Sequence, residues 1–458
     1  MKEYQNYLEK NKARFLAELK EFLAIPSISA DPKYKIHLEQ AANFIKQELS
    51  KLALTMVETI LTEGQLVVVA EFIQDPKLPT VLLYSHFDVQ PPDPLEQWES
   101  PPFEAEIRKE AIYARGAADN KTPLFCHLKA VETLIKTKGL PVNIKFVFDG
   151  AEEIGSEGLI ALIRKQPEKF KADLVLISDT SMILDDLPSL AISLRGLISL
   201  ELIVKGPNRD LHSGQNGGIV QNPINALAEM ITKIQDSNGK IQIPGFYDDV
   251  ICLTEKEVCE FNQIPFDLKS YKNKRGLTDL TSESKVELLE RLWGLPTFDC
   301  NGICGGYLGE GQKTIIPGSA SAKLSFRIVP HQDPEKIKTL IKEYLYQIKP
   351  KGVTIEILEH SGCSAVKVAK DSCEVQLAVD VLTEVHGKKP FFQGVGESIP
   401  IVLEFSKNLG IPCLLLGFGR WSDHIHSPNE NFKLADFYRG ILSLCLFLER
   451  YQKNGRTI

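Results

Sequence analysis

Apolar residues recur along this chain with two periods, and these periods predict where its helices and strands lie. The segment 7–22 places its apolar side chains near helical spacing and therefore predicts a surface-packed helix. Short continuous apolar runs are typical of buried strands, and the clearest of them, Val81–Tyr84, leads directly into His86. Such runs alternate with helical segments as far as residue 178. This alternation predicts βαβ units and a parallel sheet.

The pattern changes near residue 188. Residues 190–204 alternate between apolar and polar side chains, as one half-exposed antiparallel strand would. Helices are predicted at 223–234 and 334–348, and the α/β pattern resumes at Cys373. We therefore predict an α/β fold with a mostly parallel sheet, formed by residues 1–188 and 373–458. An α+β domain is inserted at 189–372.

The composition of the chain argues against nucleic acids and membranes as binding partners. The chain has 458 residues with a formal net charge of -7, whereas a nucleic-acid-binding surface would be basic. No run approaches the ~20 apolar residues of a membrane helix, and the first 21 residues lack the apolar core of a secretory signal. The nine cysteines are scattered, which fits free thiols in a reducing compartment. We expect a cytoplasmic protein with neither nucleic-acid nor membrane partners.

Side chains that can bind metal follow four of the predicted buried strands. They are His86 with Asp88, Glu152 with Glu153, Asp179, and His426, while Asp119 lies in a loop between the first two strands. Because the carboxyl ends of parallel strands meet at one edge of a sheet, these groups are predicted to converge. Histidine and carboxylates without cysteine suit zinc in a hydrolytic site. This many donors would serve two ions about 3.5–4 Å apart with one shared carboxylate.

Each position also has an ordinary structural explanation. Glu152 and Glu153 are typical of a solvated helix start, and Asp179 of a cap or turn. His426 precedes Ser-Pro, as a turn residue would, and His86 with Asp88 can be a buried hydrogen-bonded pair. The joint occurrence at four strand ends favours a site. Within it, one glutamate of the adjacent pair would bind metal and the other would transfer a proton, and spacing does not decide which.

Several stretches resemble, in order, the signatures of the M20 metallopeptidases. They are Ser85–Val89, Arg115–Lys121, Asp149–Ser156, Arg209–Gly214, Lys313–Pro317, Phe326–Pro330 and Ile425–Glu430. The chain length and a charged, helix-rich stretch at 248–292 are similar to the cytosolic dipeptidase, or carnosinase-like, branch. The resemblance implies a zinc-peptidase-like catalytic domain interrupted by an inserted lid or dimerisation domain.

The resemblance implies a centre of two divalent metal ions. Its ligands would be His86 and Asp179 on one ion, Glu153 and His426 on the other, and Asp119 between them. Zinc is the expected metal, with manganese or cobalt as alternatives. Glu152 would be the general base toward a metal-bridged water, and Asp88 would support His86.

The resemblance also implies functional residues in the inserted domain. His212 would reach across a homodimer and stabilise the oxyanion in the partner's site. Thr314, Arg327 and Ser398 match positions that hold the substrate's carboxylate or backbone. A guanidinium suits a carboxylate because it binds both oxygens, although a surface ion pair is the alternative role for Arg327.

We therefore predict a metallo-dipeptidase acting on dipeptides or very short peptides with a free carboxylate. An N-acyl-amino-acid deacylase with the same metals and a non-catalytic binding protein on this fold are the alternatives. One loop departs from the branch, which often reads Arg-Glu-Gly-Gly-Ser-Ile-Pro where this chain has Gly-Val-Gly-Glu-Ser-Ile-Pro at 394–400. The basic residue is absent and Glu397 is added, which leaves the substrate preference open, including toward a more basic or N-terminally charged substrate.

Overall fold

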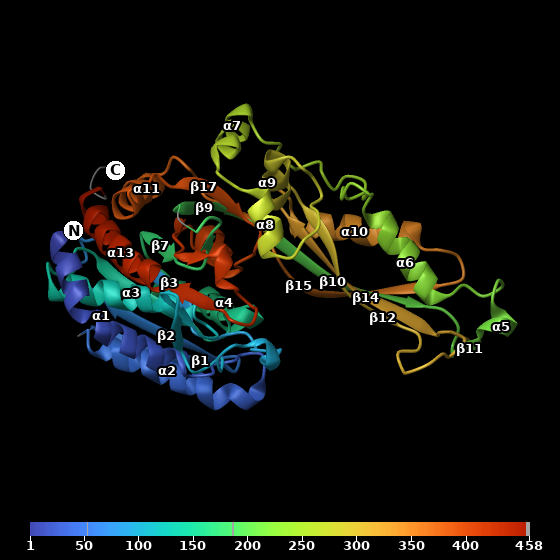
Figure 1. The fold of residues 1–458 in the computed structure, drawn as a ribbon, viewed down its shortest axis with the longest axis horizontal. Coiled ribbons are helices and arrows are strands. Elements are labelled where there is room, and N and C mark those ends of the chain that lie inside the picture. The colour runs from blue at the N-terminus through green and yellow to red at the C-terminus, as the bar shows by residue number, and fades with distance from the viewer. Residues whose placement is uncertain (53, 186, 455–458) are drawn as a thin grey trace. The chain divides into compact units, whose positions relative to one another are not determined.

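The chain forms two compact units. The computed structural model describes residues 1–52, 54–185 and 187–454 (Figure 1), so the last four residues of the predicted 373–458 segment lie outside the described part. The first unit comprises Met1–Ile192, Val368–Gln393 and Pro400–Ile458, and the second comprises Ser193–Lys367 and Gly394–Ile399. The loop that carries Ser398 therefore belongs to the second unit.

The first unit is built on a large sheet whose central strands are parallel. In spatial order its strands are β1 (Met56–Thr62), β2 (Gln65–Phe72), β6 (Asn143–Asp149), β3 (Thr80–His86), β7 (Leu174–Ile177), β18 (Cys413–Leu415) and β9 (Ser189–Leu194), and β17 (Phe391–Val395) also pairs with β9. Strands β6, β3, β7 and β18 run parallel, and the strands at either side pair antiparallel. The predicted α/β class with a parallel central sheet is confirmed.

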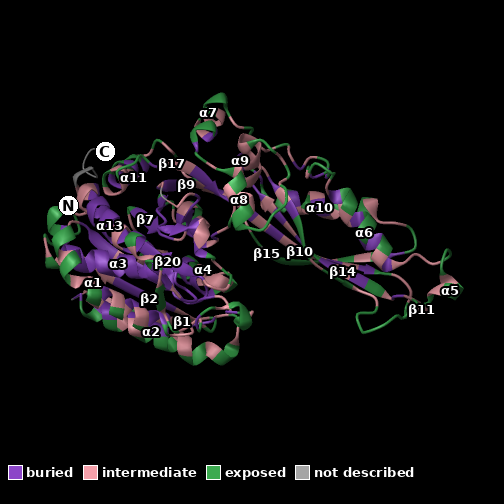
Figure 2. Cartoon of the chain, in the orientation of Figure 1, coloured by how far each residue is buried: buried purple, intermediate pink, exposed green. Residues whose placement is uncertain are grey.

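Helices cover this sheet. The helix α3 (Lys121–Lys136) packs on β3 and lies between α1 (Lys2–Leu23) and α13 (Leu434–Asn454), and α11 (Cys373–His386) packs against α13 (Figure 1). The helices α2 (Lys35–Ser50) and α4 (Glu157–Lys165) pack on β1 and β2. Because α3 contacts α1, α13 and the sheet, its residues from Lys121 to Leu134 are buried, the polar ones included (Figure 2).

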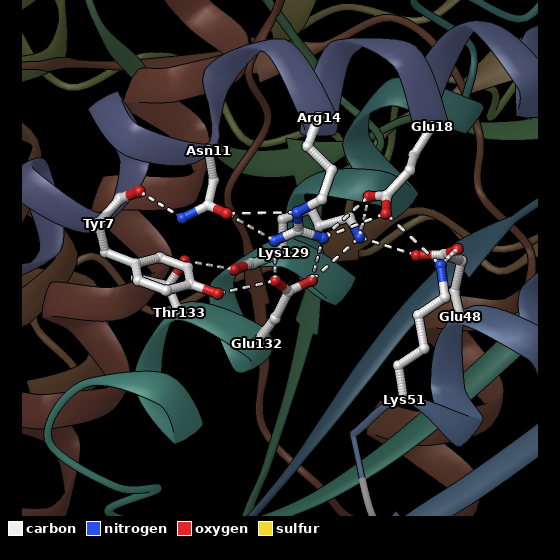
Figure 3. A network of polar contacts seen from close by, with 9 residues as sticks. All are labelled: Tyr7, Asn11, Arg14, Glu18, Glu48, Lys51, Lys129, Glu132 and Thr133. Atoms are coloured by element: carbon white, nitrogen blue, oxygen red, sulfur yellow. Dashed lines mark hydrogen bonds and ion pairs between the residues drawn. The ribbon is translucent and has the colours of Figure 1, made fainter.

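A network of buried charges joins α1, α2 and α3 (Figure 3). The ammonium of Lys129 lies 2.6 Å from a carboxylate oxygen of Glu18, 2.7 Å from Glu48 and 3.0 Å from Glu132. Arg14 pairs with Glu132 from α1. A buried ammonium is costly unless carboxylates surround it. The network therefore favours one arrangement of the two N-terminal helices on α3.

Two small sheets bring distant segments together near the ends of the central strands. One contains β4 (Glu106–Arg108), β5 (Ala111–Tyr113) and β20 (Asn431–Lys433), and the other contains β8 (Ser181–Met182) and β19 (Gly419–Arg420). The pairing of β20 with β5 places Glu430 next to the segment that follows β5, because the Ala114 amide donates to the Glu430 carbonyl at 3.1 Å.

The second unit contains an antiparallel sheet with its own core. Its strands lie in the order β12 (Thr297–Gly305), β14 (Ser319–Ile328), β10 (Gly196–Lys205) and β15 (Thr354–Cys363). The helices α6 (Pro223–Ile234) and α10 (Pro334–Ile348) pack against it. Shorter elements are β11 (Leu211–His212), α5 (Ser213–Asn216), α7 (Glu255–Gln263), α8 (Leu268–Lys274), α9 (Lys285–Trp293), β13 (Ile315–Ile316) and β16 (Val366–Lys367).

The prediction of one strand over 190–204 is wrong. The segment forms two strands, β9 and β10, which belong to different sheets and part at Arg195. A side chain at Gly196 would place its Cβ 2.5 Å from the Cys363 carbonyl oxygen, so the chain can pass this point only with glycine. β10 alternates in burial, whereas β9 is buried at three consecutive residues, Ser189–Ala191, so the period of two that the prediction assumed for the whole segment holds only in its second half.

Candidate metal centre

Two groups of metal-capable side chains meet at the carboxyl ends of the parallel strands. His86 ends β3, Asp179 follows β7, and Glu153 follows β6, and β3 pairs with both neighbours. One group contains His86, Asp119 and Asp179, and the other contains Asp119, Glu153 and His426, with ligand atoms within 4.8 Å of one another in each. Asp119 belongs to both groups.

The two oxygens of Asp119 face different groups. Oδ1 of Asp119 lies 3.0 Å from Nε2 of His86, and the same nitrogen lies 3.7 Å from Oδ1 of Asp179. Oδ2 lies 2.9 Å from Nε2 of His426, whose Nε2 is 3.3 Å from Oε2 of Glu153. This is the arrangement that a carboxylate shared between two cations requires.

The pKa values of several side chains at this centre depart from their ordinary values. Burial, reinforced by the Asp119 charge, raises the pKa of Glu153 to about 7. Burial also raises the pKa of Glu152 well above its usual range, and Asp179 adds to the effect. Hydrogen bonds to Asp119 and Glu153 raise the pKa of His426 to about 10. Carboxylates crowded in this way hold protons that divalent cations would displace.

The donor set fits two divalent cations. Among the described residues, Oε1 of Glu153 is buried and has no hydrogen-bond partner. A buried acceptor without a donor is rare in a folded protein, and a metal ligand is one explanation for it. Imidazoles and carboxylates are the donors of hydrolytic zinc sites, and the same set accepts manganese or cobalt.

Asp88 connects three of these residues. Its Oδ1 accepts from the amide of Glu152 at 3.1 Å, and its Oδ2 accepts from the amide of Glu153 at 3.0 Å. Nδ1 of His86 lies 3.3 Å from Oδ1 of Asp88 and 3.1 Å from the backbone carbonyl oxygen of Asp88. An Nδ1–H that donates here leaves Nε2 of His86 free to bind a cation beside Asp119.

Glu430 holds the loop that carries Asp119. Its Oε2 accepts from Nη1 of Arg115 at 2.8 Å and from the Gly116 amide at 2.9 Å. Its Oε1 accepts from the amides of Ala118 at 2.7 Å and Asp119 at 3.0 Å. The side chain is fully buried. All four donors thus converge on one carboxylate, which fixes the backbone of Asp119.

Sequence reasoning assigned no role to three residues that contact the ligands. Glu430 lay inside a recognised motif, as did Asn120, whose Nδ2 donates to Oδ1 of Asp179 at 2.6 Å. Gln90 donates to Oε2 of Glu153 at 2.8 Å, and no pattern in the sequence indicated it. Membership of a motif could have indicated a role for Glu430 and Asn120, because a buried polar residue needs a hydrogen-bond partner.

The remaining predicted residues belong to the second unit. Nη1 of Arg327 donates to Oγ of Ser398 at 2.9 Å, and that hydroxyl donates to the Arg195 carbonyl at 2.5 Å. His212 pairs with Ile315 across β11 and β13, and the Ser213 amide donates to the Thr314 carbonyl at 3.0 Å. The structure thus brings Arg327 together with Ser398, and His212 close to Thr314.

Comparison with known proteins identifies the family. The model of peptidase family M20/M25/M40 matches residues 82–450, a range that includes every residue of the two candidate ligand groups. The chain belongs to this family. The predicted M20 membership and hydrolase class are therefore confirmed.

Similar proteins cover almost the whole chain. The chain is 34% identical to the Cys-Gly metallodipeptidase dug1 of Schizosaccharomyces pombe over 96% of each chain. It is 31% identical to the human Beta-Ala-His dipeptidase, over 97% of this chain and 92% of that protein. The structure matches the M20 family metallo-carboxypeptidase Sso-CP2 from Sulfolobus solfataricus with a TM-score of 0.88 and 36% identity, covering 96% of this chain and 99% of that one.

Two further observations concern the environment of the chain. Among the described helices, none has both the length and the apolar character needed to cross a membrane. All nine cysteines are free thiols in the structure, and Cys126, Cys413 and Cys445 are buried.

Proposed function

We propose that the protein is a metallo-dipeptidase that hydrolyses the amide bond of dipeptides or very short peptides with a free carboxylate. The observation that carries this proposal is Asp119, whose two oxygens each face a separate group of ligands. Two relatives that cover nearly the whole chain are named dipeptidases, which supports the choice of substrate class.

Each side chain of the centre has a place in this reaction. His86 and Asp179 would hold one divalent cation, Glu153 and His426 a second, and Asp119 both. Zinc is the first candidate, and manganese or cobalt the alternative. When bound, such a pair polarises the scissile carbonyl and lowers the pKa of the attacking water.

Glu152 is the proposed general base. It takes a proton from the attacking water and returns it to the leaving amine, which must depart in its protonated form. Asp88 accepts from the Glu152 amide and also contacts His86, so it orients the base and a ligand together. A carboxylate is suited to this task only when it is deprotonated, and cations beside it would lower its raised pKa.

Residues of the second unit would bind the substrate. Arg327 would grip the free carboxylate, with Ser398 and Thr314 beside the peptide backbone. His212 would donate to the oxyanion in the site of a second copy, which makes a homodimer part of the proposal. The free cysteines support a reducing compartment, the cytoplasm.

A metal analysis combined with a substrate panel tests this function. The panel would contain Cys-Gly, β-Ala-His, dipeptides with a basic residue at either end, the C-terminal amide of one good dipeptide, and N-acetyl amino acids. We expect two metal ions per chain and turnover of dipeptides, with loss of activity on the amide and after chelation. Turnover of N-acetyl amino acids alone would indicate a deacylase.

Glu152→Gln separates chemistry from metal binding. This variant should keep both metal ions while turnover falls by about 10²–10⁴-fold, the usual contribution of a general base. Wild-type turnover would place the base elsewhere. A wild-type protein that binds no metal and hydrolyses no member of the panel would support a non-catalytic binding protein.

A further inference from the structure

A fully buried histidine lies beside the metal centre and, among the described residues, shares no hydrogen bond with the candidate ligands. His127 is on α3, and its side chain is 0% exposed. Its Nε2 is 2.8 Å from Oγ of Ser178, and its Nδ1 is 3.4 Å from Oγ of Ser85. Both serines are also buried. One imidazole therefore spans two hydroxyl groups inside the core.

The ring is neutral in this position. Burial lowers the pKa of His127 to about 3, so the imidazole carries one N–H and one lone pair. A serine hydroxyl can donate or accept, and the chain Ser85–His127–Ser178 can therefore be satisfied with either tautomer. An apolar side chain of similar size could fill the same space, but it would leave two buried hydroxyls without this partner.

The two serines occupy matching places on neighbouring strands. β3 and β7 pair in parallel with Tyr84 opposite Ile177. Ser85 is the next residue on the first strand and Ser178 follows the second. The residues after them are His86 and Asp179, which belong to the same ligand group. His127 thus connects the two strand ends one residue before each ligand.

A second contact from the same helix supports this reading. Asn120, immediately before α3, donates to the Ser178 carbonyl at 3.0 Å and to Oδ1 of Asp179 at 2.6 Å. The helix therefore holds the end of β7 at two points, through Asn120 and through His127. Of the two, only His127 also reaches β3.

We propose that His127 is a positioning residue of the metal centre, which sets the separation of His86 and Asp179 through Ser85 and Ser178. It acts on the ligand group of His86, Asp119 and Asp179, and not on the ligands Glu153 and His426. This role rests on the proposed function, because it takes that group to be a cation site. Residues that orient metal ligands typically contribute 10–100-fold to affinity.

The test measures the affinity of each cation site in the full-length protein. His127→Phe keeps a ring of similar size and removes both hydrogen bonds, and Ser178→Ala removes one hydroxyl with little change in packing. Thr133→Val is the matched control, since Thr133 is a buried α3 residue whose hydroxyl donates to the Lys129 carbonyl. Affinities for zinc come from competition with a chromophoric chelator, and cobalt absorption spectra report the geometry of the ligands.

We expect His127→Phe to weaken one of the two sites by about tenfold, at the lower end of that range, and to change the cobalt spectrum. Ser178→Ala should weaken the same site, and the double variant should be little worse than His127→Phe alone, because both act through one contact. Thr133→Val should lower the unfolding midpoint without altering either affinity.

Three results would overturn the role of His127. They are wild-type affinity and spectrum in His127→Phe, an equal loss at both sites that Thr133→Val reproduces, and additive losses in the double variant. If His127→Phe does not fold, wild-type affinity in Ser178→Ala is decisive in the same way. A wild-type protein without metal would instead refute the proposed function, and the positioning role with it.

Discussion

Replacing Glu430 by glutamine tests whether the loop of the shared ligand is held by one buried carboxylate. Each oxygen of Glu430 accepts two hydrogen bonds, and the four donors are Arg115 and the amides of Gly116, Ala118 and Asp119. Glutamine keeps one acceptor oxygen and presents an NH₂ group in place of the other. Two donors would then face a donor, and the guanidinium would lose its counter-ion.

The expected cost follows from these contacts. Two hydrogen bonds to a charged acceptor, at ~1.5–3 kcal/mol each, give a loss of ~3–6 kcal/mol. Breaking a buried ion pair by removing one partner costs ~3–5 kcal/mol. The ion pair with Arg115 includes one of these hydrogen bonds, so the two energies describe the same loss and are not summed. We expect Glu430→Gln to lower the free energy of unfolding by ~3–5 kcal/mol.

The loss should also reach the metal centre. The Asp119 amide is one of the donors, so the shared ligand would lose its fixed backbone. We expect both cations to bind 10–100-fold more weakly, a typical effect of removing a group that orients a ligand. Urea unfolding of the metal-free protein measures the stability, and chelator competition measures the affinity. Using metal-free protein matters because bound cations would themselves stabilise the fold.

Glu404→Gln is the matched control. Glu404 is also a buried carboxylate, paired with Arg164 and Asn408, and belongs to neither ligand group. It should lose stability without losing metal affinity. The reasoning would be refuted if Glu430→Gln unfolded at the wild-type urea concentration, or if its metal affinity matched that of the control.

Three further predictions concern a candidate ligand, a residue of the second unit and the buried charge network of α1, α2 and α3. His426→Ala should reduce the metal content of the purified protein, and wild-type content would exclude this ligand. His212→Ala should lose most turnover while keeping its metal. Mixing this variant with Glu152→Gln should restore activity if the two subunits of a homodimer share their sites. Mixed dimers without activity would indicate that each subunit has a self-contained site. Burial alone would raise the pKa of Glu132, but the hydrogen bonds and charges of Arg14 and Lys129 together outweigh it, and the pKa is lowered from its ordinary 4.5. The stability that Glu132 contributes is therefore complete above pH 4.5 and lost as pH falls through the lower folded value. The urea stability lost in Glu132→Gln should shrink in acid, and a pH-independent loss would contradict this.

Local signals predicted much of the fold. α6 and α10 begin at the proline that follows an asparagine or an aspartate, and in both helices that preceding side chain caps the first turn. Proline at the first helical position and an Asx cap before it are determined by neighbouring residues alone. The division of 190–204 into β9 and β10 was not predictable in this way, because it depends on which sheet each half joins.

In the candidate site, too, some residues were predictable from local sequence and others depend on tertiary packing. His86 and Asp179 follow apolar strands, so their convergence follows from strand direction. The contacts of Glu430 and His127 depend on tertiary packing. Glu430 reaches the Arg115 loop only because β20 pairs with β5, more than 300 residues away along the chain. His127 lies on a helix that is buried on nearly every side, so periodicity could not show which face meets the strand ends.

The two candidate ligand groups are held together by backbone hydrogen bonds as well as by contacts between their own side chains. Burial is the main cause of the raised pKa values of Glu152 and Glu153, and repulsion from neighbouring carboxylates, Asp119 among them, adds to it. The repulsion between these carboxylates alone would drive the loops apart. Asp88 and Glu430 oppose this because they accept backbone amides from the same loops, and those hydrogen bonds do not depend on metal. The backbone thus holds the carboxylates close together, and cations that enter would relieve a repulsion already built into the fold.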